Sequence, residues 1–252
     1  MSKTAVVTGG ASGIGQNAVE RLLAEGWRVW SLDVDKRGAS VIKVPREGGD
    51  RFRFCQCDVS NPASVTKAFE SIRTEIDKLD ALICSAGVIR IGPLEKHTPE
   101  DVDLMLGVNV KGPWLCVREA LPLLRKGASV SDPSRVVILG SVAGLRPKVG
   151  AGLYGASKAA LHVITGILAV ELGSDGVIVN AVAPGAVNTP LVKALAGTSY
   201  RRSTDSPLGR VAEPEDVTDI VMFYLSDAAK YINGTVLPVD GGSRAAFVMR
   251  EG

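Results

Sequence analysis

Short apolar runs alternate with longer amphipathic segments along the whole chain. Continuous apolar runs that end in Gly, Asp or Ser are typical of buried strands. They lie at 4–9, 27–33, 51–59, 81–87, 135–141, 177–185 and 234–242. Between them, apolar residues at helical spacing predict helices over 13–26, 61–76, 99–125, about 151–172 and from Pro214 onward. The weakly patterned segment 36–50 predicts a short helix and a loop.

The order of these elements predicts the fold class. Strands that alternate with helices are typical of α/β proteins, and continuously apolar strands indicate a parallel sheet buried on both faces. We therefore expect a doubly wound, seven-stranded parallel sheet with helices on both faces. The composition does not shift along the 252 residues in the way that would mark a linker. The sequence thus predicts one domain over 1–252.

The longest irregular stretch, 188–212, follows the sixth expected strand. Long loops in compact domains are usually either functional lids or disordered. Ligands bind at the carboxyl ends of the strands in open parallel sheets, and this stretch starts at such an end. We therefore expect 188–212 to be a substrate lid. The tail 243–252 extends beyond the last expected strand.

Composition and charge narrow the partners. The formal net charge is +2 and there is no dense Lys/Arg cluster, which does not favour a nucleic-acid partner. The N-terminus enters a strand pattern directly, and no uncharged apolar run reaches about 18 residues, so we expect neither a secretion signal nor a membrane span. A large core without a secretion signal predicts reduced thiols and a cytoplasmic location. The four cysteines do not cluster with the two histidines, so we expect no metal site.

A glycine-rich turn joins the first strand to the first helix. It runs Thr8-Gly9-Gly10-Ala11-Ser12-Gly13-Ile14-Gly15. Such glycines let a pyrophosphate approach the helix N-terminus, whose N–H groups and dipole favour anions. Asp33 ends the second strand, near the offset expected for a carboxylate that binds the adenosine ribose. A carboxylate there repels a 2′-phosphate, so the sequence predicts NAD rather than NADP, although Lys36 and Arg37 weaken that preference.

Tyr154 and Lys158 are the candidate catalytic pair. Their spacing places both side chains on one helix face, one turn apart. An ammonium near a phenol favours the phenolate and brings its pKa toward the working pH, as general acid–base catalysis requires. Ser141, at the end of the fifth strand, could bind the same substrate oxygen. Taken alone, such a pair is more typical of a solvated helix surface, so the cofactor site decides between the two interpretations.

Taken together, the motifs give the chain a close resemblance to the short-chain dehydrogenase/reductase family over residues 3–242. The glycine motif matches Thr8, Gly9, Gly13 and Gly15, and the Y-x-x-x-K motif matches Tyr154 and Lys158. The remaining matches are the D-V pair Asp58-Val59, the helix residue Asn109, Ser141, the P-G motif with its threonine (Pro184, Gly185, Thr189), and Val239–Gly242. One departure is Ser85, which stands where the family's N-A-G motif has asparagine.

The resemblance implies a Rossmann fold and assigns roles to these residues. The implied catalytic residues are Asn109, Ser141, Tyr154 and Lys158. The implied NAD-binding residues are Gly9, Ser12, Gly13, Ile14, Gly15, Asp33, Asp58, Val59, Ala86, Gly87, Asn109, Tyr154, Lys158, Pro184, Gly185, Val187 and Thr189. The substrate residues that we expect are Ser141, Tyr154, Arg90 and Leu153.

The implied activity is hydride transfer between NAD(H) and a secondary alcohol or ketone, with Tyr154 as general acid and base. Two alternatives stay open: an NADP-dependent 3-oxoacyl carrier-protein reductase, and a non-catalytic nucleotide-binding regulator on the same fold. Arg90, Arg146, Lys148, Arg201 and Arg202 lie in or near the expected substrate segments, and one of them could bind a substrate carboxylate.

The resemblance also implies a homotetramer, with a dimer possible. The helices over 99–125 and 153–173 would form its contacts. The apolar face of the second helix (Ala159, Val163, Ile167, Val170) is equally explained by packing on the sheet.

Overall fold

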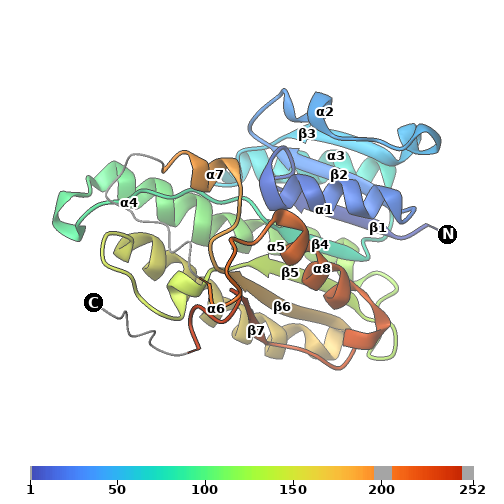
Figure 1. The fold of residues 1–252 in the computed structure, drawn as a ribbon. Coiled ribbons are helices and arrows are strands. Elements are labelled where there is room, and N and C mark those ends of the chain that lie inside the picture. The colour runs from blue at the N-terminus through green and yellow to red at the C-terminus, as the bar shows by residue number, and fades with distance from the viewer. Residues whose placement is uncertain (1, 196–205, 246–252) are drawn as a thin grey trace.

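Seven strands form one all-parallel sheet in the order β3-β2-β1-β4-β5-β6-β7 in the computed structural model, which describes residues 2–195 and 206–245 (Figure 1). The strands are β1 (Thr4–Thr8), β2 (Arg28–Asp33), β3 (Phe52–Gln56), β4 (Ala81–Cys84), β5 (Ser134–Leu139), β6 (Val177–Pro184) and β7 (Val236–Val239). The reversal of strand order between β1 and β4 is the topological switch point at which such sheets bind ligands. The predicted doubly wound parallel sheet is therefore confirmed.

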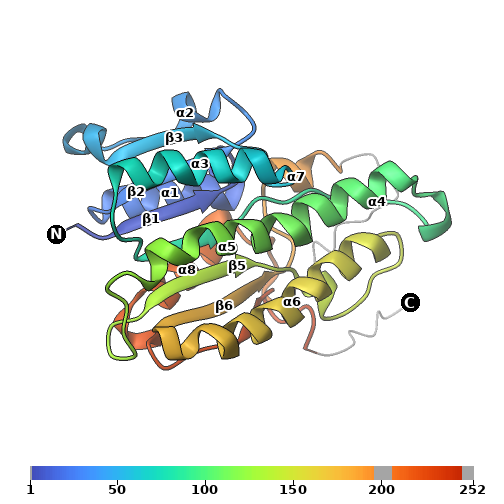
Figure 2. The same ribbon diagram turned by 180° about the vertical axis from the view of Figure 1, so that it is seen from behind.

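Helices cover both faces of the sheet (Figures 1 and 2). On one face lie α1 (Gly13–Ala24) and α8 (Pro214–Leu225), and on the other lie α3 (Pro62–Glu75), α5 (Gly112–Arg125) and α6 (Gly152–Leu172). Each layer buries its own apolar cluster against the sheet, with Leu22 and Val221 in one and Phe69 and Leu115 in the other. Every residue of β1, β4, β5 and β6 is buried, which explains their continuous apolar runs.

The segment predicted as one helix over 99–125 is helical throughout but contains a change of winding. It consists of α4 (Pro99–Leu106), a π-helical turn (Gly107–Lys111) and α5. The Thr98 side chain caps α4 by accepting a hydrogen bond from the backbone N–H of Asp101. Such π turns occur mainly at functional sites, and this one contains Asn109.

The remaining short elements lie in the connections. The weakly patterned segment 36–50 contains α2 (Gly38–Val41) and the start of a 3-10 turn (Arg46–Arg51), as expected. Further 3-10 turns are Leu94–Lys96, Val142–Gly144, Gly173–Asp175 and Asp227–Ala229. In the predicted lid, α7 (Pro190–Lys193) lies beyond the carboxyl ends of the strands (Figure 1), whereas 196–205 lies outside the described residues.

One helical stretch, Gly152–Asp175, has the length and apolar composition that a membrane-crossing helix needs. Here it covers the sheet instead. Ser157, Lys158 and Thr165, which it carries, are buried inside the fold. The predicted absence of a membrane partner stays a prediction.

Candidate active site

The glycine turn after β1 wraps closely around the start of α1. Gly9 and Gly13 have positive φ angles of 68° and 54°, which only glycine adopts without strain. A Cβ atom on Gly15 would lie 2.1 Å from the Gly9 carbonyl oxygen, so that position needs glycine for space. The N-cap residue, Ser12, makes no side-chain capping hydrogen bond. The first N–H groups of α1, including that of Ile14, thus lack a side-chain cap, which fits a dinucleotide pyrophosphate.

Asp33 lies directly beside this turn. Its Oδ2 accepts a hydrogen bond from the backbone N–H of Ala11 at 2.9 Å, and its Oδ1 accepts one from the N–H of Asp35 at 3.0 Å. The carboxylate is thereby fixed at the carboxyl end of β2, next to the turn. Arg37 is one of the two cations that weaken the predicted preference for NAD. It forms a two-point ion pair with Asp35, with Nε–Oδ1 at 3.0 Å and Nη2–Oδ2 at 2.9 Å.

The predicted adenine-binding pair follows β3. Asp58 is exposed, and its Oδ1 accepts hydrogen bonds from the backbone N–H and the hydroxyl of Ser60. Val59 is buried, and its side chain packs beneath Gly112 at the start of α5. The Asp58 carboxylate is therefore exposed beyond the end of β3, whereas the Val59 side chain belongs to the core.

The carboxyl end of β4 is tied to β1 through Thr8. The Thr8 hydroxyl accepts hydrogen bonds from the backbone N–H groups of Ser85 and Ala86, both at 3.2 Å. These contacts hold the strand end although Ser85 replaces the asparagine found in the family that the chain resembles. A Cβ atom on Gly87 would lie 3.5 Å from Asn109 Oδ1 and 3.6 Å from Lys158 Nζ. Gly87 thus lies close to the side chains of two predicted catalytic residues, Asn109 and Lys158.

Lys158 is buried next to Tyr154. Its Nζ lies 5.8 Å from the centre of the tyrosine ring and donates a 2.8 Å hydrogen bond to the Leu139 carbonyl at the end of β5. Burial lowers the pKa of Lys158 to about 8. The ammonium is therefore held on the face of α6 that also carries Tyr154, as the helical spacing predicted.

Ser141 follows β5 and caps the short turn Val142–Gly144. Its Oγ accepts a hydrogen bond from the backbone N–H of Ala143 at 3.1 Å. The hydroxyl can still donate its own proton, because accepting a hydrogen bond leaves the O–H free to point elsewhere. Both Ser141 and Tyr154 line one cavity of about 920 Å³.

The residues that follow β6 border the site and lie next to the glycine turn. Pro184 ends the strand, and the Gly185 N–H donates to the Val239 carbonyl. Val187 and Thr189 are buried, and a Cβ atom on Gly13 would lie 3.1 Å from the Thr189 methyl group. The glycine turn and the P-G segment, far apart in the sequence, are therefore in contact.

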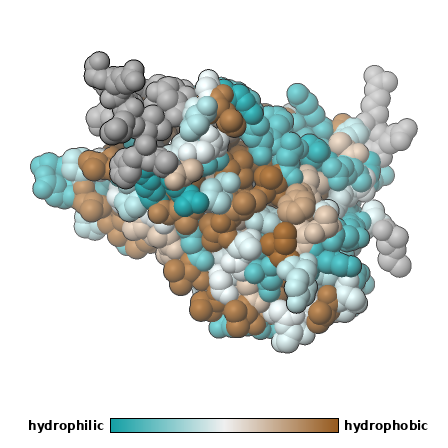
Figure 3. All heavy atoms as spheres, turned by 60° about the horizontal axis from the view of Figure 1, so that its bottom comes forward, coloured by the Kyte–Doolittle hydropathy of each residue, from teal (hydrophilic) through white to brown (hydrophobic). Residues whose placement is uncertain are grey.

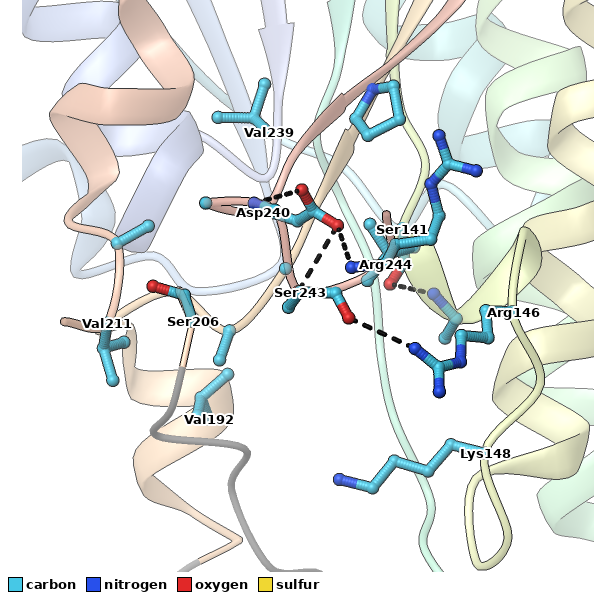
Figure 4. A pocket seen from close by; sticks show the side chains of 18 of the residues that line it. Ser141, Arg146, Lys148, Val192, Ser206, Val211, Val239, Asp240, Ser243 and Arg244 are labelled. Atoms are coloured by element: carbon cyan, nitrogen blue, oxygen red, sulfur yellow. Dashed lines mark hydrogen bonds between the residues drawn. The ribbon is translucent and has the colours of Figure 1, made fainter. Parts of the chain in front are cut away.

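The cavity is lined by Tyr154 and by residues at and after the carboxyl ends of β6 and β7, and Figure 4 shows the part of it between Ser141 and Val239. Apolar side chains supply much of its wall. They are Ile89, Val142, Pro147, Val149, Leu191, Val192, Leu195, Leu208, Val211, Ile220, Leu237, Pro238 and Val239. Both described ends of the predicted lid therefore border the substrate space.

Two predicted substrate residues do not line this cavity. Arg90 forms an ion pair with Asp101 of α4 at 3.3 Å, and half of its side chain is exposed. Leu153 precedes Tyr154 on α6 but is absent from the lining, as Arg90 is. Arg146 and Lys148 do line it, whereas Arg201 and Arg202 lie outside the described residues.

The sequence did not predict two further parts of the site. The first is the chain end from Leu237 to Arg244, which forms one cavity wall. Its V-D-G-G motif, placed after a last parallel strand, was the available signal. The second is His162, whose ring packs against Gly140 and Gly144 on either side of Ser141. Its position one helical turn after Lys158 was the signal there.

The donor set fits a dinucleotide with a nicotinamide near Tyr154. The glycine turn would hold the pyrophosphate, Asp33 the adenosine ribose, and Lys158 the other ribose. Among the described residues, no group of three or more His, Cys, Asp or Glu side chains could hold a metal ion.

Comparisons with known proteins agree with this geometry. A family model described as enoyl-(acyl carrier protein) reductase matches residues 9–244. The cyclopentanol dehydrogenase of Comamonas sp. (strain NCIMB 9872) is 34% identical over 248 residues, which cover 96% of this chain and 97% of that protein.

Two solved structures are similar as well. One is the 3-ketoacyl-(acyl-carrier-protein) reductase from Brucella melitensis, complexed with NADH, with a TM-score of 0.87 and 32% sequence identity. The similarity covers 95% of this chain and 97% of that chain. The Pseudomonas aeruginosa RhlG/NADP active-site complex has a TM-score of 0.86 at 32% identity and covers 95% of both chains. With the sheet order, the paired Tyr154 and Lys158, and this full-length similarity established, the chain belongs to the short-chain dehydrogenase/reductase family of oxidoreductases.

Proposed function

We propose that this protein is an NAD(H)-dependent dehydrogenase or reductase that interconverts a secondary alcohol and its ketone. One observation carries the proposal: Tyr154 and Ser141 line the same cavity, and the buried Lys158 lies 5.8 Å from the tyrosine ring. A tyrosine hydroxyl beside a buried ammonium can exchange a proton near neutral pH. The similarity to a cyclopentanol dehydrogenase supports an alcohol as the substrate.

The roles of the chain's own groups follow from their positions. The Tyr154 Oη takes the proton of the alcohol in oxidation and returns it to the carbonyl oxygen in reduction. The Ser141 hydroxyl donates to the same oxygen and orients it. Lys158 favours the phenolate through its charge and binds ribose hydroxyls. A nicotinamide cofactor, when bound, supplies or accepts the hydride.

Asn109 has a positioning role in this proposal. Its side chain is fully buried and donates to the Ser157 hydroxyl at 3.1 Å, and that hydroxyl donates to the Tyr154 carbonyl at 2.7 Å. The Asn109 amide is thus connected to the backbone of Tyr154 through the Ser157 hydroxyl. A water held at Asn109 would continue the proton path from Lys158 to solvent.

The preference for NAD over NADP rests on the charges around Asp33. Its carboxylate lies next to the glycine turn, where it would repel a 2′-phosphate. Arg37 is held by Asp35 in a two-point ion pair. The solved relatives bind NADH in one case and NADP in the other, so this preference depends on residues of this chain.

A carrier-protein reductase is the second candidate, because the matching family model and one solved relative have that description. The two functions differ in their substrates. Steady-state rates with secondary alcohols, cyclic ketones and a 3-oxoacyl thioester, each with both cofactors, separate them. Turnover of alcohols with NAD supports the proposal, whereas turnover restricted to thioesters with NADPH favours the reductase.

Tyr154→Phe tests catalysis itself. The variant keeps the ring beside Lys158 and removes only the proton-carrying oxygen. We expect it to bind NADH with unchanged affinity and to lose at least about a thousandfold in kcat, as expected when the general acid of a reaction is removed. A wild-type protein that binds NADH but turns over no alcohol, ketone or thioester would instead be a nucleotide-binding regulator.

We also propose that the protein self-associates, most simply as a homotetramer, in the cytoplasm. Ala159 on α6 is half-buried, but Val163, Ile167 and Val170 are 67%, 54% and 83% exposed, so the alternative of packing on the sheet is wrong for these three residues. Figure 3 brings the lower edge of Figure 1, where α6 and β7 lie, toward the viewer and shows hydrophobic residues at the surface there. Light scattering of the wild type and of Val170→Glu tests this: the variant should have the lower mass.

A further inference from the structure

The cavity beside Tyr154 carries an excess of positive side chains. Among the described residues that line it, the acids are Asp216 and Asp240, and the bases are Arg146, Lys148, Arg210 and Arg244. The numbers alone do not show where an anion would bind, because each charge has to be considered with its neighbours.

Both acids are engaged by neighbouring groups of the cavity wall. Asp216 forms a two-point ion pair with Arg210, at 2.6 and 2.7 Å, and accepts the N–H of Glu213. Asp240 accepts hydrogen bonds from the N–H groups of Gly242 and Arg244 and from the Ser243 hydroxyl. These contacts neutralise Arg210 and turn the Asp240 carboxylate toward its own chain segment.

Arg146 and Lys148 lie together on the loop that follows Ser141. The Arg146 N–H donates to the Val142 carbonyl at 2.8 Å, and the Ala151 N–H donates to the Lys148 carbonyl at 3.0 Å. The loop is also tied to the segment after β4, because the Gly92 N–H donates to the Gly150 carbonyl at 2.9 Å. These backbone hydrogen bonds fix the conformation of the loop that carries both cations and that follows Ser141.

The side chains of this pair point toward the cavity. Figure 4 shows the Lys148 side chain extending from the loop toward the side of the cavity on which Val192 lies, with Arg146 above it. Arg146 Nη1 donates to the Ser243 carbonyl at 3.2 Å, which joins the loop to the chain end that forms the opposite wall. Lys148 is partly buried, and burial lowers its pKa. An ammonium moved partly out of water gains more from an anionic ligand than an exposed one does.

We infer that the substrate carries an anionic group remote from its reacting carbon, and that Arg146 and Lys148 bind this group. The inference rests on the proposed function, since it takes Tyr154 and Ser141 as the reacting end. The apolar lining of the same cavity, with Val142, Leu191 and Val192, would take the hydrocarbon part. The ligand class is thus an amphipathic keto or hydroxy compound, whose anion is either its own carboxylate or the phosphate of a phosphopantetheine arm.

Two matched pairs of probes test the charge and distinguish its sources. The first pair is 4-oxocyclohexanecarboxylate and its methyl ester, and the second is acetoacetyl-pantetheine with and without its 4′-phosphate. Reduction by NADH is followed for each compound. We expect the anionic member of one pair to have at least about a tenfold higher kcat/KM, the usual effect of a hydrogen bond to a charged group. The pair that shows the preference identifies the source.

Variants locate the effect. Lys148→Met and Arg146→Met should each lower the ratio of anionic to neutral kcat/KM about tenfold, and Lys148→Arg should retain most of it. The matched control is Lys78→Met, whose ammonium pairs with Asp80 at the amino end of the sheet, and its ratio should equal that of the wild type. Equal kcat/KM for both members of each pair in the wild type, or unchanged ratios in both methionine variants, would overturn the inference.

A binding measurement separates this inference from the proposed function. Calorimetric titration of the four probes into protein saturated with NAD, which cannot reduce a ketone, measures binding without turnover. One outcome supports the anion site and contradicts the proposed activity: the wild type binds the anionic probe preferentially, the Lys148→Met variant has lost this preference, and no probe is reduced. If probes are reduced without a charge preference, the activity stands and the anion site falls. Equal binding of both members of each pair, with no reduction, contradicts both.

Discussion

The side-chain amide of Asn109 forms two hydrogen bonds with the backbone of Val88. Its Oδ1 accepts the Val88 N–H and its Nδ2 donates to the Val88 carbonyl, both at 2.9 Å. The same Nδ2 also donates to the Ser157 hydroxyl on α6. One buried residue in the π turn therefore connects the segment after β4 with the helix that carries Tyr154. An isolated solvated asparagine would have none of these partners.

We predict that Asn109→Ala impairs both the fold and the site. It removes the partners of both backbone groups of Val88 in a partly buried place, which costs on the order of 2–3 kcal/mol of unfolding free energy. It also releases the contact to Ser157, so kcat and the affinity for NADH should fall at a temperature at which the variant is folded. Urea unfolding and NADH titration measure the two effects.

Asn233 offers a matched control. It makes the same double contact with backbone, because its Oδ1 accepts the Val179 N–H at 2.8 Å and its Nδ2 donates to the Ala169 carbonyl at 2.9 Å. It lies outside the cavity lining. Asn233 is exposed, so Asn233→Ala should lose less unfolding free energy than Asn109→Ala and should keep kcat. If both variants lose activity in parallel with stability, Asn109 has a structural role only.

The charges around Asp33 predict how cofactor preference can be changed. Asp33→Ser removes the carboxylate beside the glycine turn, and the ratio of kcat/KM for NAD to that for NADP should fall at least about tenfold, the scale of one lost charge repulsion. Asp35→Asn should also lower the ratio, because it releases Arg37 from its ion pair and makes its guanidinium available to a 2′-phosphate. The double variant should have the lowest ratio. Unchanged ratios in all three would show that other residues select the cofactor.

Positions fixed by local spacing were predictable from the sequence. Tyr154 and Lys158 share a helix face because their spacing is that of one helical turn. Asp33 reaches the glycine turn because both occupy the carboxyl ends of neighbouring parallel strands. The π turn at Asn109 was not predicted, because one extra residue in a helical turn hardly changes the apolar spacing of 99–125.

Positions fixed by tertiary contacts were not predictable. Arg90 follows β4 as expected, but α4 places Asp101 within ion-pair distance and draws the side chain away from the cavity lining. The exposed face of α6 has the same apolar composition as a core face, and only the position of the sheet shows that Val163 points away from it. The wall from Leu237 to Arg244 reaches the cavity because β7 pairs with β6, which is a contact between distant segments.

The close approach of His162 to Gly140 gives a prediction about packing. A Cβ atom at Gly140 would lie 2.5 Å from His162 Nε2 and 3.3 Å from the Val182 carbonyl oxygen. Gly140→Ala should therefore lower the unfolding free energy by about 1–3 kcal/mol, the range found for overpacked cores. It should also reduce kcat, because the displaced backbone carries Ser141.

A second substitution should relieve this clash. His162→Ala removes the ring that the new methyl group meets, so the Gly140→Ala/His162→Ala protein should be more stable than the sum of the single effects predicts. Thermal unfolding of the four proteins completes the double-mutant cycle. Additive effects would mean that the clash at Gly140 lies with the Val182 carbonyl instead.

The depressed pKa of Lys158 predicts how stability depends on pH. Its pKa is about 8 in the folded protein and 10.5 in the unfolded chain. Below pH 8 the lysine is charged in both states, and the folded state bears the full cost of burying the ammonium. Between pH 8 and 10.5 the unfolded chain holds a proton that the folded protein has released, so the contribution of Lys158 to stability rises with pH.

Lys158→Met removes this charge and should therefore stabilise the protein while it abolishes turnover. At pH 7 we expect a gain on the order of 2 kcal/mol, because the lost hydrogen bond to Leu139 offsets part of the relieved burial cost. The gain should shrink toward zero near pH 10.5. Burial raises the pKa of the Cys57 thiol to about 11, which lowers stability above pH 9 in both proteins, so the comparison uses the difference between them. Urea unfolding at pH 6 to 10 measures it, and a gain that stays constant with pH would show that the pKa of Lys158 is not lowered in the folded protein.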